Sequence, residues 1–217
     1  MKTTERTTEL NNFEVINTTN FYISDLHFGH ENVIRFDNRP FGSVEEMDAE
    51  LIRRWNSVVS RGDTVHIIGD FCWKTEDYWF ELLNQLKGNK VLIKGNHDLR
   101  RMSEKLQKKF QDIREIKSIK ENNYRVTMCH YPLMFYPHDH SARSIMLCGH
   151  VHQTIENDYL DLWRAKLIED AKAGDANQGR IINVGCMQPY MDYTPRTLEE
   201  LLAWWESEFA KGEKDDR

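Results

Sequence analysis

The sequence predicts an α/β fold in which layered sheets are covered by helices. Three observations support this prediction. Short buried apolar runs recur along the 217 residues, stretches with helical apolar spacing lie between them, and polar residues that can bind metals follow most of the runs. Alternating strand and helix signals are typical of sheets that carry helices on their faces.

Six short apolar runs are predicted to form buried strands, because each contains only a few residues and lies next to polar or turn-forming residues. His66 lies inside one of these runs rather than at its end, so we interpret it as a packed histidine of the sheet. The predicted strands are Phe21–Ile23, Val65–Ile68, Val91–Ile93, Tyr124–Met128, Ile145–Leu147 and Ile181–Val184.

Three stretches are predicted to be helices, because their apolar residues fall on one face. Ser43 and Glu46 have the spacing of a capping box, and Thr197 and Glu200 open the last of the three helices. The middle helix stops before Gly88, a residue type that commonly ends helices. The predicted helices cover residues 43–60, 75–86 and 197–210.

No repeat, low-complexity tract or linker divides residues 1–217, so we expect a single domain. One segment is left open between a helix around Leu160–Ile168 and a long excursion with little order. The expected parts are a polar tail over residues 1–12, a motif-bearing core over 21–152, the open segment 155–179, and a C-terminal strand and helix over 181–210.

The composition is that of a globular protein without a membrane span. Hydrophobic residues make up 40% of the chain and charged residues 29%, as is usual for globular proteins. No apolar run approaches the roughly 18 residues that a membrane span requires. The polar start lacks the apolar region of a secretory signal, so we expect a cytoplasmic protein. The four cysteines lie far apart and are interpreted as buried free thiols: Cys72, Cys129, Cys148 and Cys186.

Metal-capable side chains follow five of the predicted strands, at the ends where open α/β sheets place their binding crevices. Each alone is weak support, because a single His is usually a surface or core residue and a Gly-Asp pair is usually a turn. Their joint order, DxH, GD, GNHD, H and GHxH, is far harder to obtain by chance. The residues are Asp25 and His27, Asp70, Asn96, His97 and Asp98, His130, and His150 and His152.

These motifs resemble those of the calcineurin-like metallophosphoesterase superfamily over about Phe21 to His152. The wider text SDLHFGHENVIRF, NRPF and CHYPL is similar to a small bacterial and phage branch of that superfamily. The resemblance implies a layered α/β/β/α sandwich, in which two packed mixed sheets are flanked by helices. The matching motifs are Asp25-Leu26-His27, Gly69-Asp70, Gly95-Asn96-His97-Asp98, His130 and Gly149-His150-Val151-His152.

The resemblance also implies two divalent metal ions and a general acid. Carboxylate, imidazole and amide ligands without thiolate suit Mn²⁺, which we expect first, with Fe, Zn²⁺ or Ni²⁺ as alternatives. By resemblance, His97 faces the substrate and protonates or hydrogen-bonds the leaving-group oxygen. The implied ligands are Asp25, His27 and His152 for one metal, Asn96, His130 and His150 for the other, and Asp70 as the bridge.

Residues near the motifs have more than one interpretation. His30, Arg35 and Arg39 are candidates for substrate binding, although helix-start polarity and surface solvation explain them as well. Asp98 either orients its loop or ring, or caps a turn. His138 and His140 are interpreted as part of a solvated loop. The aromatic residues of the next group are interpreted as core residues: Trp73, Tyr78, Trp79 and Phe80.

The sequence therefore predicts a metal-dependent phosphoesterase, in which a hydroxide shared by two metals attacks phosphorus without a covalent enzyme intermediate. The expected substrate is a small phosphate ester or nucleotide, either a diester or a monoester. A phosphomonoesterase or protein phosphatase is the nearest alternative, whereas a nuclease or a non-catalytic interaction module on this fold is disfavoured. The net charge of -6 argues against stable nucleic-acid binding, no membrane partner is expected, and the oligomeric state is left open.

Overall fold

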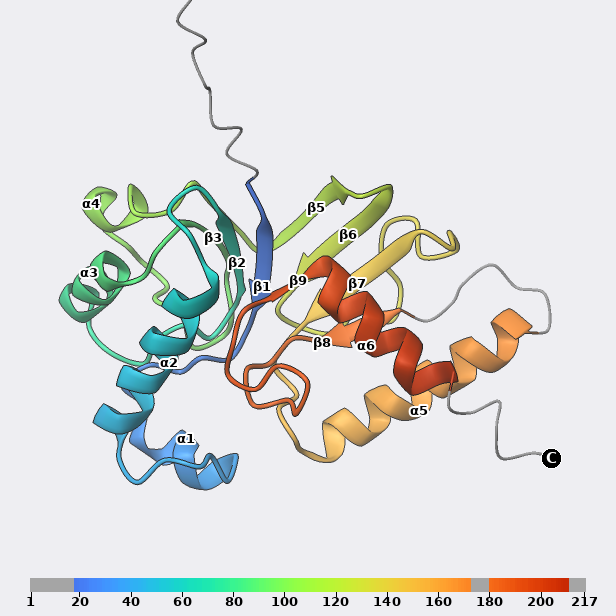
Figure 1. The fold of residues 1–217 in the computed structure, drawn as a ribbon, viewed down its shortest axis with the longest axis horizontal. Coiled ribbons are helices and arrows are strands. Elements are labelled where there is room, and N and C mark those ends of the chain that lie inside the picture. Colours follow the sequence, from blue (N-terminus) through green and yellow to red (C-terminus); the bar gives the residue numbers. More distant parts are fainter. Residues whose placement is uncertain (1–17, 173–179, 211–217) are drawn as a thin grey trace, which may run out of the picture.

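The computed structural model describes residues 18–172 and 180–210, and their strands form two sheets (Figure 1). The first sheet has the order β4-β3-β2-β1-β9, and the second has the order β5-β6-β7-β8. Both sheets are mixed, because β9 runs antiparallel to β1 and β5 runs antiparallel to β6, while the other pairs are parallel. The strands are β1 (Asn20–Ile23), β2 (Thr64–Ile68), β3 (Asn89–Ile93), β4 (Asp112–Arg114), β5 (Ile116–Glu121), β6 (Tyr124–Cys129), β7 (Ser144–Cys148), β8 (Ile181–Asn183) and β9 (Arg196–Thr197).

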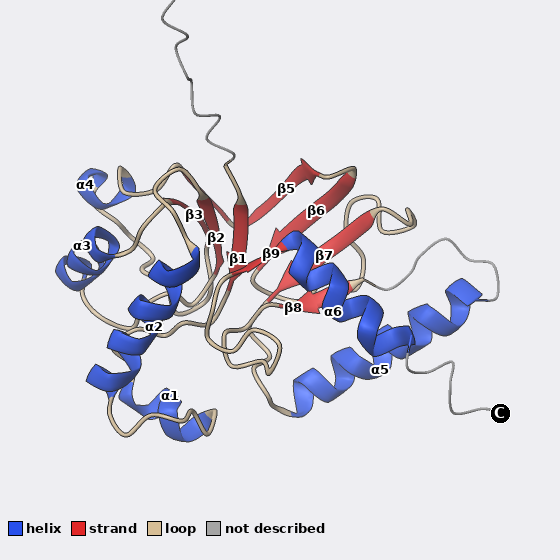
Figure 2. Cartoon of the chain, viewed as in Figure 1, coloured by secondary structure: helices blue, strands red, loops and turns tan. Residues whose placement is uncertain are grey.

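Helices flank the two sheets, as Figure 2 shows by colouring helices blue and strands red. The helices that follow β1, β2 and β3 lie beside the first sheet, and α5 lies beside the second (Figure 1). Two mixed sheets with flanking helices confirm the predicted α/β fold class. The helices are α1 (Glu31–Phe36), α2 (Val44–Val58), α3 (Glu76–Gln85), α4 (Glu104–Gln107), α5 (Ile155–Lys172) and α6 (Leu198–Ala210).

The strand β7 shows how the layers are built, because its side chains alternate between two apolar cores. Ile145 and Leu147 belong to the main core, which also contains the buried residues of the first sheet. Met146 and Cys148 belong to a second core that includes Leu160 of α5. This period of two is the one expected for a strand that is buried on both faces.

The segment that the sequence left open is helical over Ile155–Lys172, while residues 173–179 lie outside the described residues. Leu160 and Leu167 are buried against the second sheet, but Leu162 is 68% exposed. Apolar residues therefore lie on more than one side of α5, and its sequence lacks the one-sided pattern that marks an amphipathic helix.

Two predicted helix starts are confirmed by hydrogen bonds at their first turns. The Ser43 hydroxyl accepts from the Glu46 N–H at 3.2 Å, while the Glu46 carboxylate accepts from Gly42 N–H at 2.7 Å. At α6, the Thr197 hydroxyl accepts from Glu200 N–H at 3.2 Å, and the Glu200 carboxylate accepts from Thr197 N–H at 2.7 Å. The second pair satisfies two helix-end donors reciprocally.

The ends of the chain and the cysteines complete the comparison with the sequence. The predicted tail 1–12 lies outside the described residues. Among the helices in the described ranges, none has the length and apolar character that crossing a membrane requires. All four cysteines are free, and only Cys129 is not fully buried, which confirms their interpretation as unpaired thiols.

Candidate metal centre

The metal-capable residues follow β1, β2, β3, β6 and β7, and hydrogen bonds join these loops at the carboxyl ends of the strands. The Asp25 N–H donates to Gly69 O at 3.1 Å, and the His27 N–H donates to Asp70 O at 2.9 Å. The two sheets also meet here, because Ser24 N–H donates to Val184 O at 2.9 Å. The loops that carry the predicted site residues therefore meet where the two sheets join.

A first group of four side chains, from Asp25, His27, Asp70 and His152, offers one donor atom each, all within 4.8 Å of one another. The Nε2 atoms of His27 and His152 lie 3.3 Å apart. A carboxylate oxygen lies 3.6 Å from each, namely Asp70 Oδ2 from His27 and Asp25 Oδ1 from His152. Two imidazoles and two carboxylates without thiolate fit a divalent cation.

A second group of donors also lies next to Asp70. His130 Nε2 is 3.4 Å from Asp70 Oδ2 and 3.1 Å from Asn96 Oδ1. The ring of His150 lies 5.2 Å from that of His130, measured between centroids. Asp70 Oδ2 is therefore close to a histidine of each group, and its bridging role stays a prediction.

The glycines of three motifs leave room for this packing. A Cβ atom on Gly69 would overlap the His130 ring, and one on Gly95 would overlap the Asp70 carboxylate. A Cβ on Gly149 would overlap the side chains of Ser24 and Asp25. Glycine precedes Asp, Asn and His in these motifs because the neighbouring donors approach its backbone more closely than any side chain allows.

The backbone at the strand exits adopts a conformation that is rare outside glycine. Left-handed φ values cost roughly 1–2 kcal/mol per residue for ordinary side chains, and such strain clusters at functional sites. The surrounding hydrogen bonds must hold these residues in place. The residues are Asp25 (φ 55°), His27 (φ 51°), Asp70 (φ 52°), His150 (φ 73°) and His152 (φ 47°).

Two histidines are oriented through Nδ1, so that Nε2 points to the centre. His130 Nδ1 is 2.9 Å from the carbonyl oxygen of Ile68, and His152 Nδ1 is 2.8 Å from Asp37 Oδ1. An acceptor at Nδ1 places the imidazole proton there and leaves the Nε2 lone pair for a metal.

The pKa values in the cluster reflect burial and the charge of its carboxylates. Burial lowers the pKa of His27 to about 2, so this imidazole is neutral and able to bind a metal. Burial also disfavours charge on Asp70 and His130, but their contact outweighs it, lowering the pKa of Asp70 and raising that of His130. A cation that binds here must therefore displace a proton from His130.

Asp98 holds two of the site loops together. Its buried carboxylate accepts from the N–H groups of Gly95 at 2.8 Å, Phe71 at 2.8 Å and Asp70 at 3.1 Å. Burial raises the pKa of Asp98 to about 6. Of its two interpretations, orientation of the loop is the one that these contacts support. The adjacent His97 is exposed, and its N–H donates to Asp70 Oδ1 at 2.9 Å.

A family model described as the calcineurin-like phosphoesterase superfamily domain matches residues 21–199. The chain belongs to this family. Two sequence relatives of this calcineurin-like phosphoesterase carry names that state no activity. An uncharacterised protein of Methanocaldococcus jannaschii is 36% identical over 141 residues, 64% of this chain and 72% of that protein. The gene 66 protein of Mycobacterium phage L5 is 40% identical over 81 residues, 36% of this chain and 39% of the phage protein, in agreement with the predicted bacterial and phage branch.

A solved structure also resembles this calcineurin-like phosphoesterase. It is a protein of unknown function from Aquifex aeolicus, with a TM-score of 0.61 and 25% sequence identity. The alignment covers 87% of this chain and 100% of that chain. The similarity therefore extends over nearly the whole described fold, whereas the function must be argued from the site.

The structure contradicts the substrate-binding role predicted for Arg39 in this calcineurin-like phosphoesterase. Its side chain is 0% exposed, and its guanidinium donates to the Asp37 carboxylate at 2.9 and 3.0 Å. It also donates to the carbonyl oxygens of Leu26 at 2.9 Å and Asp25 at 2.8 Å. Arg39 therefore holds the Asp25 backbone and the Asp37 carboxylate, and its buried guanidinium is not open to a phosphate.

Asp37 contacts a residue of the candidate site, and the sequence reasoning missed it. It lies between Arg39 and His152, and burial of its carboxylate is outweighed by hydrogen bonds from both, which lower its pKa. Only its position two residues before an arginine, in the turn after α1, could have indicated this role.

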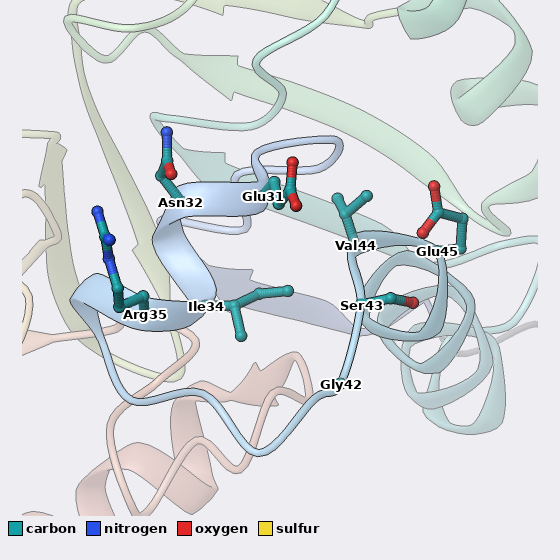
Figure 3. Close-up of a pocket in the computed structure, with 8 residues that line it drawn as sticks. All are labelled: Glu31, Asn32, Ile34, Arg35, Gly42, Ser43, Val44 and Glu45. Carbon is teal, nitrogen blue, oxygen red and sulfur yellow. The ribbon is translucent and has the colours of Figure 1, made fainter.

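The other two substrate candidates lie near α1. The ring of His30 is 5.5 Å from that of His27, at the edge of the metal centre. Arg35 lines a cavity of about 440 Å³ between α1 and the first turn of α2, together with Asn32 and Glu45 (Figure 3). The substrate-binding role of His30 and Arg35 stays a prediction.

The core interpretation is wrong for Trp73 and Tyr78, which are 46% and 38% exposed. The Trp73 ring lies 4.5 Å from that of His97. By contrast, Trp79 is fully buried as predicted, and His66 is a buried histidine stacked on Tyr22. The helical spacing that explains Trp79 does not apply to Trp73, which precedes α3.

Proposed function

We propose that this calcineurin-like phosphoesterase hydrolyses a phosphate ester at a two-metal site, by direct attack of water on phosphorus. The observation that carries the proposal is the shared carboxylate, because Asp70 Oδ2 lies 3.6 Å from His27 Nε2 and 3.4 Å from His130 Nε2. A carboxylate between two groups of donors is what a pair of bridged cations requires.

The donors of the two groups next to Asp70 are oxygen and nitrogen atoms of carboxylate, imidazole and amide groups, and no cysteine is among them. This chemistry favours Mn²⁺, with Fe, Zn²⁺ or Ni²⁺ as alternatives. When bound, two divalent cations lower the pKa of a water and neutralise charge on the phosphoryl oxygens. The proposed ligands are Asp25, His27 and His152 for one cation, Asn96, His130 and His150 for the other, and Asp70 for both.

His97 is the proposed general acid, which donates a proton to the leaving-group oxygen. It is exposed, and its ring lies 5.7 Å from the ring of His27. Its backbone N–H donates to Asp70 Oδ1, so the acid would lie next to cations held by this carboxylate. A general acid in this position contributes roughly 10²–10⁴-fold to the rate.

The proposed substrate is a small phosphate ester or nucleotide, as a diester or a monoester. The site described above recognises a phosphoryl group, and the surrounding loops must select what is attached to it. The net charge of -6 disfavours a nuclease. The four free cysteines support a reducing compartment, which agrees with a cytoplasmic location.

The test uses the full-length protein, stripped with a chelator and reloaded with Mn²⁺. We expect two metal ions per chain by elemental analysis, and metal-dependent hydrolysis of bis-p-nitrophenyl phosphate or p-nitrophenyl phosphate. The preferred ester separates a diesterase from a phosphomonoesterase or protein phosphatase. Two bound metals without turnover of any ester would support a non-catalytic module and overturn the proposal.

A further inference from the structure

Few contacts hold the imidazole ring of His97, the proposed general acid. In the part of the chain that the structure describes, the contacts of His97 are a backbone hydrogen bond to Asp70 and ring packing, with no hydrogen bond to the imidazole. The backbone bond leaves both side-chain torsions free. A general acid must lie within hydrogen-bond reach of the leaving-group oxygen, so its orientation has to come from packing.

Trp73 is the nearest ring to His97. The two ring centroids are 4.5 Å apart with an interplanar angle of 50°, whereas the His27 ring is 5.7 Å away. Trp73 also stacks on His30, with the centroids 4.3 Å apart and the rings 9° from parallel. A single indole thus links the general acid to a second histidine at the edge of the metal centre.

The segment that carries Trp73 is itself held firmly. The backbone N–H of Trp73 donates to Phe28 O at 2.9 Å, and Phe28 pairs with Cys72 as an isolated bridge. Next to Phe28, the Gly29 N–H donates to both carboxylate oxygens of Asp48, at 2.9 and 3.0 Å. The indole is therefore attached to the same paired segments that carry His27 and Asp70, because the His27 N–H donates to Asp70 O on these segments.

We propose that Trp73 is a positioning residue that holds the His97 imidazole in the orientation from which it protonates the leaving group. This inference rests on the proposed function and adds to it a residue that binds neither metal nor phosphate. Core packing does not account for an indole that is 46% exposed at the rim of the site. Removal of the indole should therefore affect proton donation and leave metal binding intact.

The first experiment compares Trp73→Leu with the native chain, both loaded with Mn²⁺, on p-nitrophenyl phosphate and phenyl phosphate or on the corresponding diesters. Phenolate is a more basic leaving group than p-nitrophenolate, so its departure depends more on protonation by the general acid. We expect kcat on the phenyl ester to fall by about tenfold to a hundredfold, since small misplacements of catalytic groups cost this much. The p-nitrophenyl ester should lose less than about threefold, and KM and metal content should be unchanged.

Two further variants control for general damage. Phe135→Leu removes another exposed aromatic ring, which packs on Trp163, and should leave both activities unchanged. Trp73→Phe retains an aromatic ring and should restore part of the lost activity. Equal losses of Trp73→Leu on both esters, or a loss of metal, would overturn the inference.

The second experiment asks whether Trp73 acts through His97. If it does, adding Trp73→Leu to His97→Ala should slow the phenyl ester no further, whereas independent effects would multiply and overturn the inference. Removing the indole should also shift the His97 ring-proton NMR resonances. If His97→Ala itself has no effect on either ester, the general-acid assignment fails. If His97→Ala is impaired while Trp73→Leu is normal, only the role of Trp73 fails.

Discussion

The Nδ1 atom of His152 lies 2.8 Å from the carboxylate of Asp37. This contact fixes the tautomer of a proposed metal ligand, and Arg39 fixes Asp37 in turn. We expect Asp37→Asn, which removes the charge but keeps the shape, to weaken metal binding by about 10–100-fold. Titration with Mn²⁺ against a fluorescent chelator measures this. Asp192→Asn, which alters an exposed carboxylate paired with Arg54, should bind metal normally, and equal affinity of the two variants would refute the role of Asp37.

Asp70 is proposed to serve both cations, so its removal has a different consequence from that of any other ligand. We expect Asp70→Ala to lose metal at both positions, because one carboxylate supports two cations. His150→Ala should lose one metal and retain the other. Elemental analysis after gel filtration measures the stoichiometry. Two metals per chain in Asp70→Ala would contradict the bridging assignment.

Arg39 is buried with its charge paired, so it should matter for stability. Arg39→Gln leaves the Asp37 carboxylate without its cation, and breaking a buried pair in this way costs about 3–5 kcal/mol. Thermal or urea unfolding of the metal-free protein measures the loss. Arg35→Gln removes an arginine that lines a surface cavity and should unfold like the native chain. A native-like stability of Arg39→Gln would show that its hydrogen bonds are dispensable.

His66 is predicted to make folding stability depend on pH. Burial lowers its pKa from 6.5 to about 4 in the folded chain, so the unfolded state binds the proton more readily. The contribution of His66 is complete above pH 6.5 and is lost as pH falls towards 4. The full loss is about 3 kcal/mol, at about 1.4 kcal/mol per pKa unit.

His66→Phe should therefore lose less stability than the native chain between pH 6.5 and 4, as measured by urea unfolding at each pH. The matched change His140→Gln alters an imidazole that is 81% exposed and should leave the pH dependence unchanged. Parallel curves for the native chain and His66→Phe would contradict the shifted pKa.

The sequence predicted the buried strands and the converging residues because both leave strong local signals. It missed β4 and β5, whose residues are exposed or half-buried, and β9, which has only two residues. Such edge strands carry little apolar pattern. Asp37 and Trp73 were missed for a different reason, since their roles depend on which distant side chains they contact, and that information exists only in the folded chain.

The left-handed strand exits restrict which amino acids can occupy the ligand positions. Asn, Asp and His are the non-glycine residues that tolerate this region best, and the five residues found there are Asp and His. A change to Ala at Asp25 would thus alter the backbone preference as well as the donor, while Asp25→Asn would alter mainly the charge. Evolutionary substitutions at these positions should therefore be limited mainly to Asp, Asn, His and Gly. Related proteins that no longer bind cations would then keep the same turns.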